Sequence, residues 1–172
     1  GRYCNEALIE DFLSADGYEI VSPEQLHLVD QVALMQNAEV LLFAESSALH
    51  LYALVQRADQ KVGLIQRRRS LPPLISNQLQ DGPAEIHAIN AITEIYWPPK
   101  RQDNVSIAKL DFGRLRDMLV DRHFVSESAR WRAPDVIEEA ISLHAGLASG
   151  TQLVPDAQRL DWLRAQRRKA GS

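Results

Sequence analysis

A short polar turn, Glu45-Ser46-Ser47, separates two apolar segments that differ in their periodicity. Residues 40–43 form an uninterrupted apolar run typical of a strand, whereas residues 49–55 have the apolar spacing of a helix. The N-terminus of a helix presents unpaired N–H groups and a partial positive charge, and both favour phosphate. In a parallel sheet such a turn lies at the carboxyl end of a strand, where ligands bind. The sequence therefore predicts the phosphate-binding corner of a nucleotide-type site.

The same turn has a simpler interpretation, in which it only starts the helix. Ser46 would then be the N-cap, and Glu45 a carboxylate near the positive end of the helix. His50 comes four residues after Ser46, which would place it one helical turn away on the same face. It could either reach a phosphate or pack against the sheet as a structural histidine.

Two basic segments are further candidates for binding phosphate. Arg2 precedes Asn5-Glu6, and arginine stays charged and can bind a phosphate through two hydrogen bonds. Glu6 could position that arginine or a ribose, although a solvated terminus followed by a helix cap explains the same residues. Arg67-Arg68-Arg69 follows a strand-like segment, so one arginine, which we assign to Arg67, could face a diphosphate. Such clusters are also commonly solvated or in contact with a partner.

The elements that must position these residues alternate along the first part of the chain. Apolar periodicity, together with proline, glycine and cap residues, marks their boundaries. Alternation of this kind predicts an α/β fold with a parallel sheet, right-handed crossovers and flanking helices, that is, a Rossmann-like sheet. The uninterrupted apolar run at 40–43 predicts a strand that is covered on both faces. The expected helices lie at 6–15, 23–36 and 46–57, and the expected strands at 18–21, 40–43 and 61–65.

The pattern is less regular in the rest of the chain. We expect residues 1–125 to form the Rossmann-like lobe and residues 126–172 to form a C-terminal helical extension that packs on it. The remaining predicted elements are strand-like residues at 85–97, a polar loop at 100–104, a candidate edge strand at 105–108, and helices at 111–122, 134–147 and 156–169.

Composition narrows the class of protein. The 172 residues are enough for one α/β core. Their net charge of −4 lacks the basic footprint of a nucleic-acid-binding protein. Cys4 is the single cysteine, which excludes an internal disulfide framework and a cysteine-based zinc site. The apolar runs are far shorter than the roughly 18 residues that span a bilayer. We therefore expect a cytoplasmic protein, peripheral to a membrane at most through the basic end of its last helix.

Several motifs, in their order and spacing, resemble glycosyltransferase family 61, including the bacterial proteins called capsular polysaccharide biosynthesis proteins. The resemblance begins at Arg2-Tyr3-Cys4-Asn5-Glu6, continues through the strand-like residues 17–21 and the helix beginning near Gln25-Leu26, and includes Glu45-Ser46-Ser47-Ala48-Leu49-His50. It covers residues 2–67 well and 104–120 weakly. The matching region is similar to the C-terminal part of family members, which are longer than this chain.

The resemblance implies a two-lobed enzyme of the GT-B type, of which this chain would be the nucleotide-sugar-binding C-terminal lobe and a fragment lacking the N-terminal lobe. A nucleotide-diphosphate sugar would be the donor and a glycan the acceptor, in surface or capsular polysaccharide synthesis. Ser46 and Ser47 would hold the diphosphate and Glu45 a sugar or ribose hydroxyl. His50, Arg2, Glu6 and Arg67 complete the predicted donor site.

Two departures from the family pattern qualify this expectation. Ser46 stands where the family usually has glycine, so its side chain narrows the backbone's access to a phosphate. No Asp-x-Asp metal motif occurs in the sequence, so we expect no metal or other cofactor, and the helix N-terminus and arginines would stabilise the diphosphate. The sequence does not assign a catalytic base.

Two alternatives remain open at the level of sequence. One is a non-catalytic module of the same fold that binds a nucleotide or a sugar, and the other is an interaction domain that binds no ligand and could form a homodimer. The sequence disfavours a dinucleotide-dependent oxidoreductase, because no G-x-G-x-x-G turn follows any predicted strand.

Overall fold

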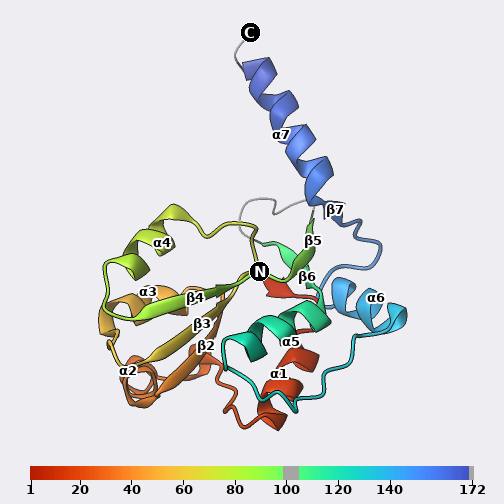
Figure 1. Cartoon of the computed structure of the whole chain (residues 1–172). Coiled ribbons are helices and arrows are strands. Elements are labelled where there is room, and N and C mark those ends of the chain that lie inside the picture. Colours follow the sequence, from red (N-terminus) through yellow and green to blue (C-terminus); the bar gives the residue numbers. More distant parts are fainter. Residues whose placement is uncertain (99–104, 171–172) are drawn as a thin grey trace.

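A computed structural model describes residues 1–98 and 105–170, so the polar loop predicted at 100–104 lies outside the described residues. The chain is a mixed α/β protein with two sheets and helices on both sides (Figure 1). The first sheet is parallel, and its strands stand in the order β2 (Val40–Ala44), β3 (Lys61–Ile65) and β4 (Glu85–Ile89). This sheet contains the strands that flank the polar turn.

The second sheet carries the N-terminus of the described chain. Its strands stand in the order β1 (Arg2–Tyr3), β6 (Ile107–Leu110), β5 (Ile92–Trp97) and β7 (Val154–Pro155). The β1 strand is parallel to β6, whereas the other two pairings are antiparallel. The predicted parallel sheet with flanking helices is confirmed by β2, β3 and β4, whereas the second, mostly antiparallel sheet was not predicted.

Helices cover both faces of the parallel sheet (Figure 1). On one face lie α2 (Leu28–Asn37), α3 (Ala48–Val55) and α4 (Pro73–Gln80), and on the other α1 (Glu6–Ala15) and α5 (Phe112–Asp121). Successive strand residues point to opposite faces, so Leu64 joins the core beneath α2–α4 while Ile65 joins the core beneath α1 and α5. These two cores fix the ends of β2 and β3 relative to the helices.

The C-terminal part consists of α6 (Val136–His144) and α7 (Asp156–Ala170). Figure 1 shows α7 extending away from the rest of the molecule. Its base is held by Trp97, whose Nε1 donates to Asp156 Oδ1 at 2.9 Å and whose ring lies 3.8 Å from the Arg159 guanidinium. No helix among the described residues has both the length and the apolar character needed to cross a membrane.

Several predicted elements are confirmed, including the helix at 6–15 and the strand at 61–65 with its stated ends. The strand predicted at 18–21 is wrong, because the structure forms no strand there. Tyr18 is bound elsewhere: its N–H donates to Leu13 O at 3.0 Å and its hydroxyl to Phe124 O at 2.7 Å. These contacts hold the segment at the end of α1 rather than beside β2.

Three further predictions need correction. The helix predicted at 23–36 is interrupted, because Leu26 has extended backbone angles between a 3-10 turn at Pro23–Gln25 and the start of α2. The β2 strand is less buried than predicted, since it lies at the edge of its sheet and Val40 is 42 % exposed. The predicted edge strand near 105–108 is β6, which lies inside its sheet between β1 and β5.

The close approach of β3 to its neighbours generates a stability prediction. A Cβ at Gly63 would lie 2.6 Å from Leu42 Cδ1 and 2.9 Å from Phe124 Cζ, both in the core beneath α1 and α5. We expect Gly63→Ala to lower the free energy of unfolding by about 1–3 kcal/mol through overpacking, measured by urea denaturation. The control is Gly113→Ala at an exposed position of α5, where the nearest atom would be 3.4 Å away. An unchanged midpoint for Gly63→Ala would contradict this packing.

Candidate functional site

The carboxyl ends of β2 and β3 are joined by the side chain of Glu45, which is 0 % exposed. Glu45 Oε2 accepts hydrogen bonds from the backbone N–H groups of Arg67 at 2.8 Å and Arg68 at 3.1 Å. Arg68 Nε lies 3.0 Å from Glu45 Oε1, but Oε1 has no hydrogen-bond partner among the described residues, so this contact is an ion pair without hydrogen-bond alignment. The carboxylate thus fixes the loop after β3 against the turn after β2.

The turn after β2 and the loop after β3 together form the corner. Tyr3 connects the N-terminal strand to it. Its buried hydroxyl donates to Ile65 O at 2.6 Å and accepts from Glu45 N at 2.9 Å. Burial raises the pKa of this hydroxyl well above its ordinary value, the largest opposing effect being the hydrogen bond with the Glu45 backbone. The hydroxyl therefore stays protonated at any physiological pH and holds β1 to the ends of β2 and β3.

Arg67 is an uncompensated buried cation in the described part of the chain. Only 4 % of the residue is exposed, and Nη1 donates to the backbone oxygen of Ser106 at 3.4 Å and to its hydroxyl. Nε has no hydrogen-bond partner, and no described carboxylate lies within ion-pair distance of the guanidinium. Burial, followed by the charge of Arg68, lowers its pKa, and Glu45 only partly offsets this. A buried charge is costly unless it is paired, so this corner favours an anion.

The two serines of the turn lie at the surface. Both Ser46 and Ser47 are exposed, and α3 begins at Ala48, two residues after the predicted start of the helix. Ser47 is the N-cap but makes no capping hydrogen bond through its side chain, while Ser46 Oγ accepts a long hydrogen bond of 3.4 Å from Ala48 N. The N-terminus of α3 is therefore only weakly capped by the chain itself.

The structure brings together some of the predicted site residues and separates others. Glu45 and Arg67 meet at the corner, and Glu6 is close enough to raise the pKa of Arg67 electrostatically. Arg2 points elsewhere, because its guanidinium donates to the carbonyls of Ser142, Leu143 and Ala145 at the end of α6. It acts there as a cap for the negative end of that helix.

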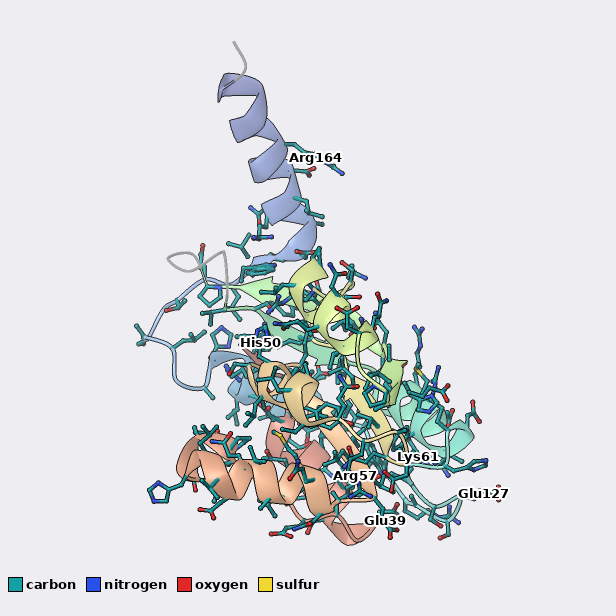
Figure 2. All side chains as sticks on the ribbon, turned by 90° about the vertical axis from the view of Figure 1, so that its left-hand side faces the viewer. Glu39, His50, Arg57, Lys61, Glu127 and Arg164 are labelled. Atoms are coloured by element: carbon teal, nitrogen blue, oxygen red, sulfur yellow. The ribbon has the colours of Figure 1, made fainter. Side chains whose placement is uncertain are left out.

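His50 is also bound to a residue outside the corner. Its Nδ1 lies 2.6 Å from Gln78 Oε1, which links α3 to α4. Figure 2 shows His50 apart from the charged residues Glu39, Arg57 and Lys61, which belong to the opposite, amino-terminal ends of β2 and β3. The histidine therefore has a structural partner in the described protein.

A groove of ≈ 590 Å³ begins beside the corner and runs along the open edge of β2. Its walls come from α1, α2, β2 and residues 16–21, and Ser46 lies on its lining. The described lining contains no lysine or arginine but four carboxylates, namely Glu6, Glu10, Asp16 and Glu19. Negative charge of this density disfavours phosphate inside the groove, so a diphosphate fits the arginine corner better than the groove.

Sequence reasoning missed Tyr3, Arg68 and Ser106 as parts of this corner. Tyr3 lies in a strand of two residues, too short to show a period. The alternation of side chains along β3 could have indicated that Arg67 is buried, because it places the side chains of Ile65 and Arg67 on the same side of the chain. Ser106 pairs with Arg67 only through tertiary structure, 39 positions later in the sequence.

The family model for Glycosyltransferase 61 matches residues 1–62. This region includes Tyr3, Glu6, β2 and the Glu45-Ser46-Ser47 turn, so it builds one side of the corner and most of the groove. The match supports the resemblance to glycosyltransferase family 61 and suggests glycosyltransferase activity. It spans 62 of the 172 residues. Comparisons with curated proteins and with solved structures found no match.

The two hydrogen bonds of the Tyr3 hydroxyl lead to a prediction about stability. Tyr3→Phe keeps the ring but removes the donor to Ile65 O and the acceptor for Glu45 N. We expect it to lower the free energy of unfolding by about 0.5–1.5 kcal/mol, because both buried groups lose a hydrogen bond and keep only the 3.2 Å bond from Glu45 N to Ile65 O. Thermal or urea unfolding measures this change. Tyr96→Phe, which removes only a half-buried bond to Glu94, is the matched control and should have a smaller effect.

Glu6 generates a prediction of pH dependence. Burial raises its pKa above the ordinary value, with Glu10 adding to the shift and the backbone hydrogen bond of Tyr3 opposing it. A raised folded-state pKa means that ionised Glu6 destabilises the fold at neutral pH. We expect Glu6→Gln to raise the free energy of unfolding at pH 7, and this gain should vanish as pH falls to about 4, near the unfolded pKa.

The measurement is a series of urea titrations between pH 4 and pH 7. Asp11→Asn, an exposed substitution on the same helix, is the control and should change stability little at either pH. A gain for Glu6→Gln that stays constant across this range would contradict the prediction.

Proposed function

We propose that this chain provides the donor site of a glycosyltransferase that transfers a sugar from a nucleoside diphosphate to a glycan acceptor. The observation that carries the proposal is the buried guanidinium of Arg67, which lacks a carboxylate partner among the described residues. It lies at the carboxyl end of β3, beside the turn at the carboxyl end of β2, where ligands of parallel sheets bind. The family match over residues 1–62 supports the choice of reaction class.

The chemistry of sugar transfer explains the value of a cation here. When the bond between the sugar and the diphosphate breaks, the departing diphosphate gains negative charge that the protein must stabilise. Arg67 would meet that charge from within the protein, and Arg68, whose side chain is 34 % exposed, from the surface. Donors that are fixed before the reaction are more effective than water, because they need no reorganisation. Ser46 and Ser47 would bind the same phosphates from the N-terminus of α3.

We further propose that the acceptor site and the catalytic base lie in another lobe of a larger, two-lobed protein. In that arrangement this chain is the nucleotide-binding lobe of a GT-B-type enzyme for a surface polysaccharide, and another lobe supplies the acceptor site and the catalytic base. Glu45 is unsuited to act as that base, since its carboxylate is buried and already accepts two backbone hydrogen bonds.

The engagement of Glu45 also favours a second candidate function. A module that binds a nucleotide-sugar without transferring the sugar needs the cationic corner but no base. Turnover separates the two functions: the full-length protein should release nucleoside diphosphate from the donor only in the presence of acceptor if it is the enzyme. Tight donor binding without release would favour the binding module.

Calorimetric titration with UDP, GDP and CDP tests the proposed donor site. We expect one of them to bind, and Arg67→Gln to weaken that binding by about 10-fold or more, since a hydrogen bond to a charged group contributes about 1.5–3 kcal/mol. Arg57→Gln, at the opposite end of the sheet (Figure 2), is the control and should bind normally. Ser47→Trp provides an independent block at the exposed turn. No binding by any nucleotide, or equal binding by all variants, would refute the site.

A further inference from the structure

The groove beside β2 is located where one more strand of the parallel sheet would lie. One wall is α1, through Ile9 and Leu13, and the opposite wall is α2, through Leu34 and Met35. Its inner side is the edge of β2, and its outer side is formed by residues 16–21. A space bounded by two helix layers and a strand edge is the space that the next strand of an α/β sheet fills.

The edge of β2 is open in the described structure. β2 pairs only with β3, so its other side presents backbone N–H and C=O groups without strand partners. Its side chains are also incompletely buried, with Val40 42 % exposed. Exposed strand edges readily pair with another strand, and proteins commonly cover them.

The segment at residues 18–21 is suited to this position. Its sequence, Tyr-Glu-Ile-Val, is rich in residues that favour strands, yet Ile20 and Val21 are 41 % and 39 % exposed. None of the backbone N–H groups of residues 19–21 donates to a described residue. The segment already lines the groove, and the bonds of Tyr18 to Leu13 O and Phe124 O hold only its first residue at the end of α1.

The order of elements also fits this occupant. β2, α3 and β3 form one parallel unit, and β3, α4 and β4 form the next. Because α2, α3 and α4 share one face of the sheet, a parallel strand at 18–21 followed by α2 and β2 would repeat the same unit with the same hand. Other extended segments would not have this connection.

We propose that residues 18–21 dock into the groove as a fourth parallel strand beside β2, in exchange with the open arrangement. Tyr18 and Ile20 would then point toward α1, because Tyr18 already packs against that core. Glu19 and Val21 would point toward the α2 side, since successive strand residues face opposite ways. Docking buries Ile20 and Val40, which offsets the loss of freedom in the segment.

Docking would also affect the neighbouring corner. A smaller hollow of ≈ 300 Å³ lies between Pro23, Glu24 and Gln31 on one side and Ser46 and Ser47 on the other. With residues 18–21 in the sheet, the connection to α2 would leave the carboxyl edge beside the Ser46 turn. The docked strand thus sets one wall of the space above the serines. The docking itself does not depend on the proposed glycosyltransferase function.

Hydrogen exchange of the unmodified chain, monitored by NMR or mass spectrometry, tests the docking directly. We expect at least one amide proton within residues 19–21, whose N–H groups have no acceptor in the open arrangement, to exchange about 10-fold or more slowly than in an unstructured peptide of the same sequence, because a docked strand donates alternate N–H groups to β2. Exchange of the whole segment at the unstructured rate would overturn the proposal.

A pair of cysteine variants tests the orientation of the docked strand. Adjacent strands lie about 4.8 Å apart, within the range of Cα separations that a disulfide accepts. Ile20→Cys should therefore form a disulfide under mild oxidation with a cysteine on the α1 side of β2, introduced as Val40→Cys or Leu42→Cys. The matched control pairs Ile20→Cys with Leu41→Cys on the opposite face. Equal cross-linking of the control, or none of either same-face pair in folded protein, would contradict the docking.

Discussion

The structure depends on a buried hydrogen-bond junction between Tyr3 and Glu45. The Tyr3 hydroxyl binds the backbone at the ends of β2 and β3 at once, and the Glu45 carboxylate binds the loop that follows β3. Two sheets of different pairing are thereby joined at one corner, although no ladder of strand hydrogen bonds connects them. Together with the pairing of Ala44 with Ile65, this junction fixes the Arg67 loop relative to the Ser46 turn and so preorganises the corner.

The junction also explains why Arg67 remains unpaired. Glu45 is the nearest buried carboxylate, but its hydrogen-bonding capacity is directed to backbone N–H groups of Arg67 and Arg68, and its ion pair is with the Arg68 side chain. The Arg67 guanidinium is left with Ser106, a neutral partner. The buried Arg67 guanidinium therefore lacks a compensating negative charge, which a bound diphosphate would supply. The acidic groove next to the corner confines that preference to the corner.

Local patterns in the sequence were sufficient for α1, β3 and α5, whose apolar periods come from neighbouring residues. They were insufficient where tertiary contacts decide the outcome. Residues 18–21 have the composition of a strand, but Tyr18 is bound to Leu13 and Phe124. Glu45 was expected to contact a ligand, and only its partners 22 and 23 positions later show that it is a buried clamp. Arg2 was grouped with the site by its chemistry and by the family resemblance, and His50 by its spacing and the same resemblance, whereas their partners lie on α6 and α4.

The most direct test of the account is an NMR titration that follows the Nε–H resonance of Arg67 and the backbone amides of Ser46 and Ser47 as a nucleoside diphosphate is added. Nε–H has no described acceptor in the free chain, so a phosphate oxygen that binds there should shift its resonance strongly, together with the serine amides. The Nε–H of Arg57, which already donates to Asp59, should stay unchanged. Shifts confined to the acidic groove or to α7, with Arg67 unaffected, would contradict the claim that this buried guanidinium is the centre of an anion-binding site.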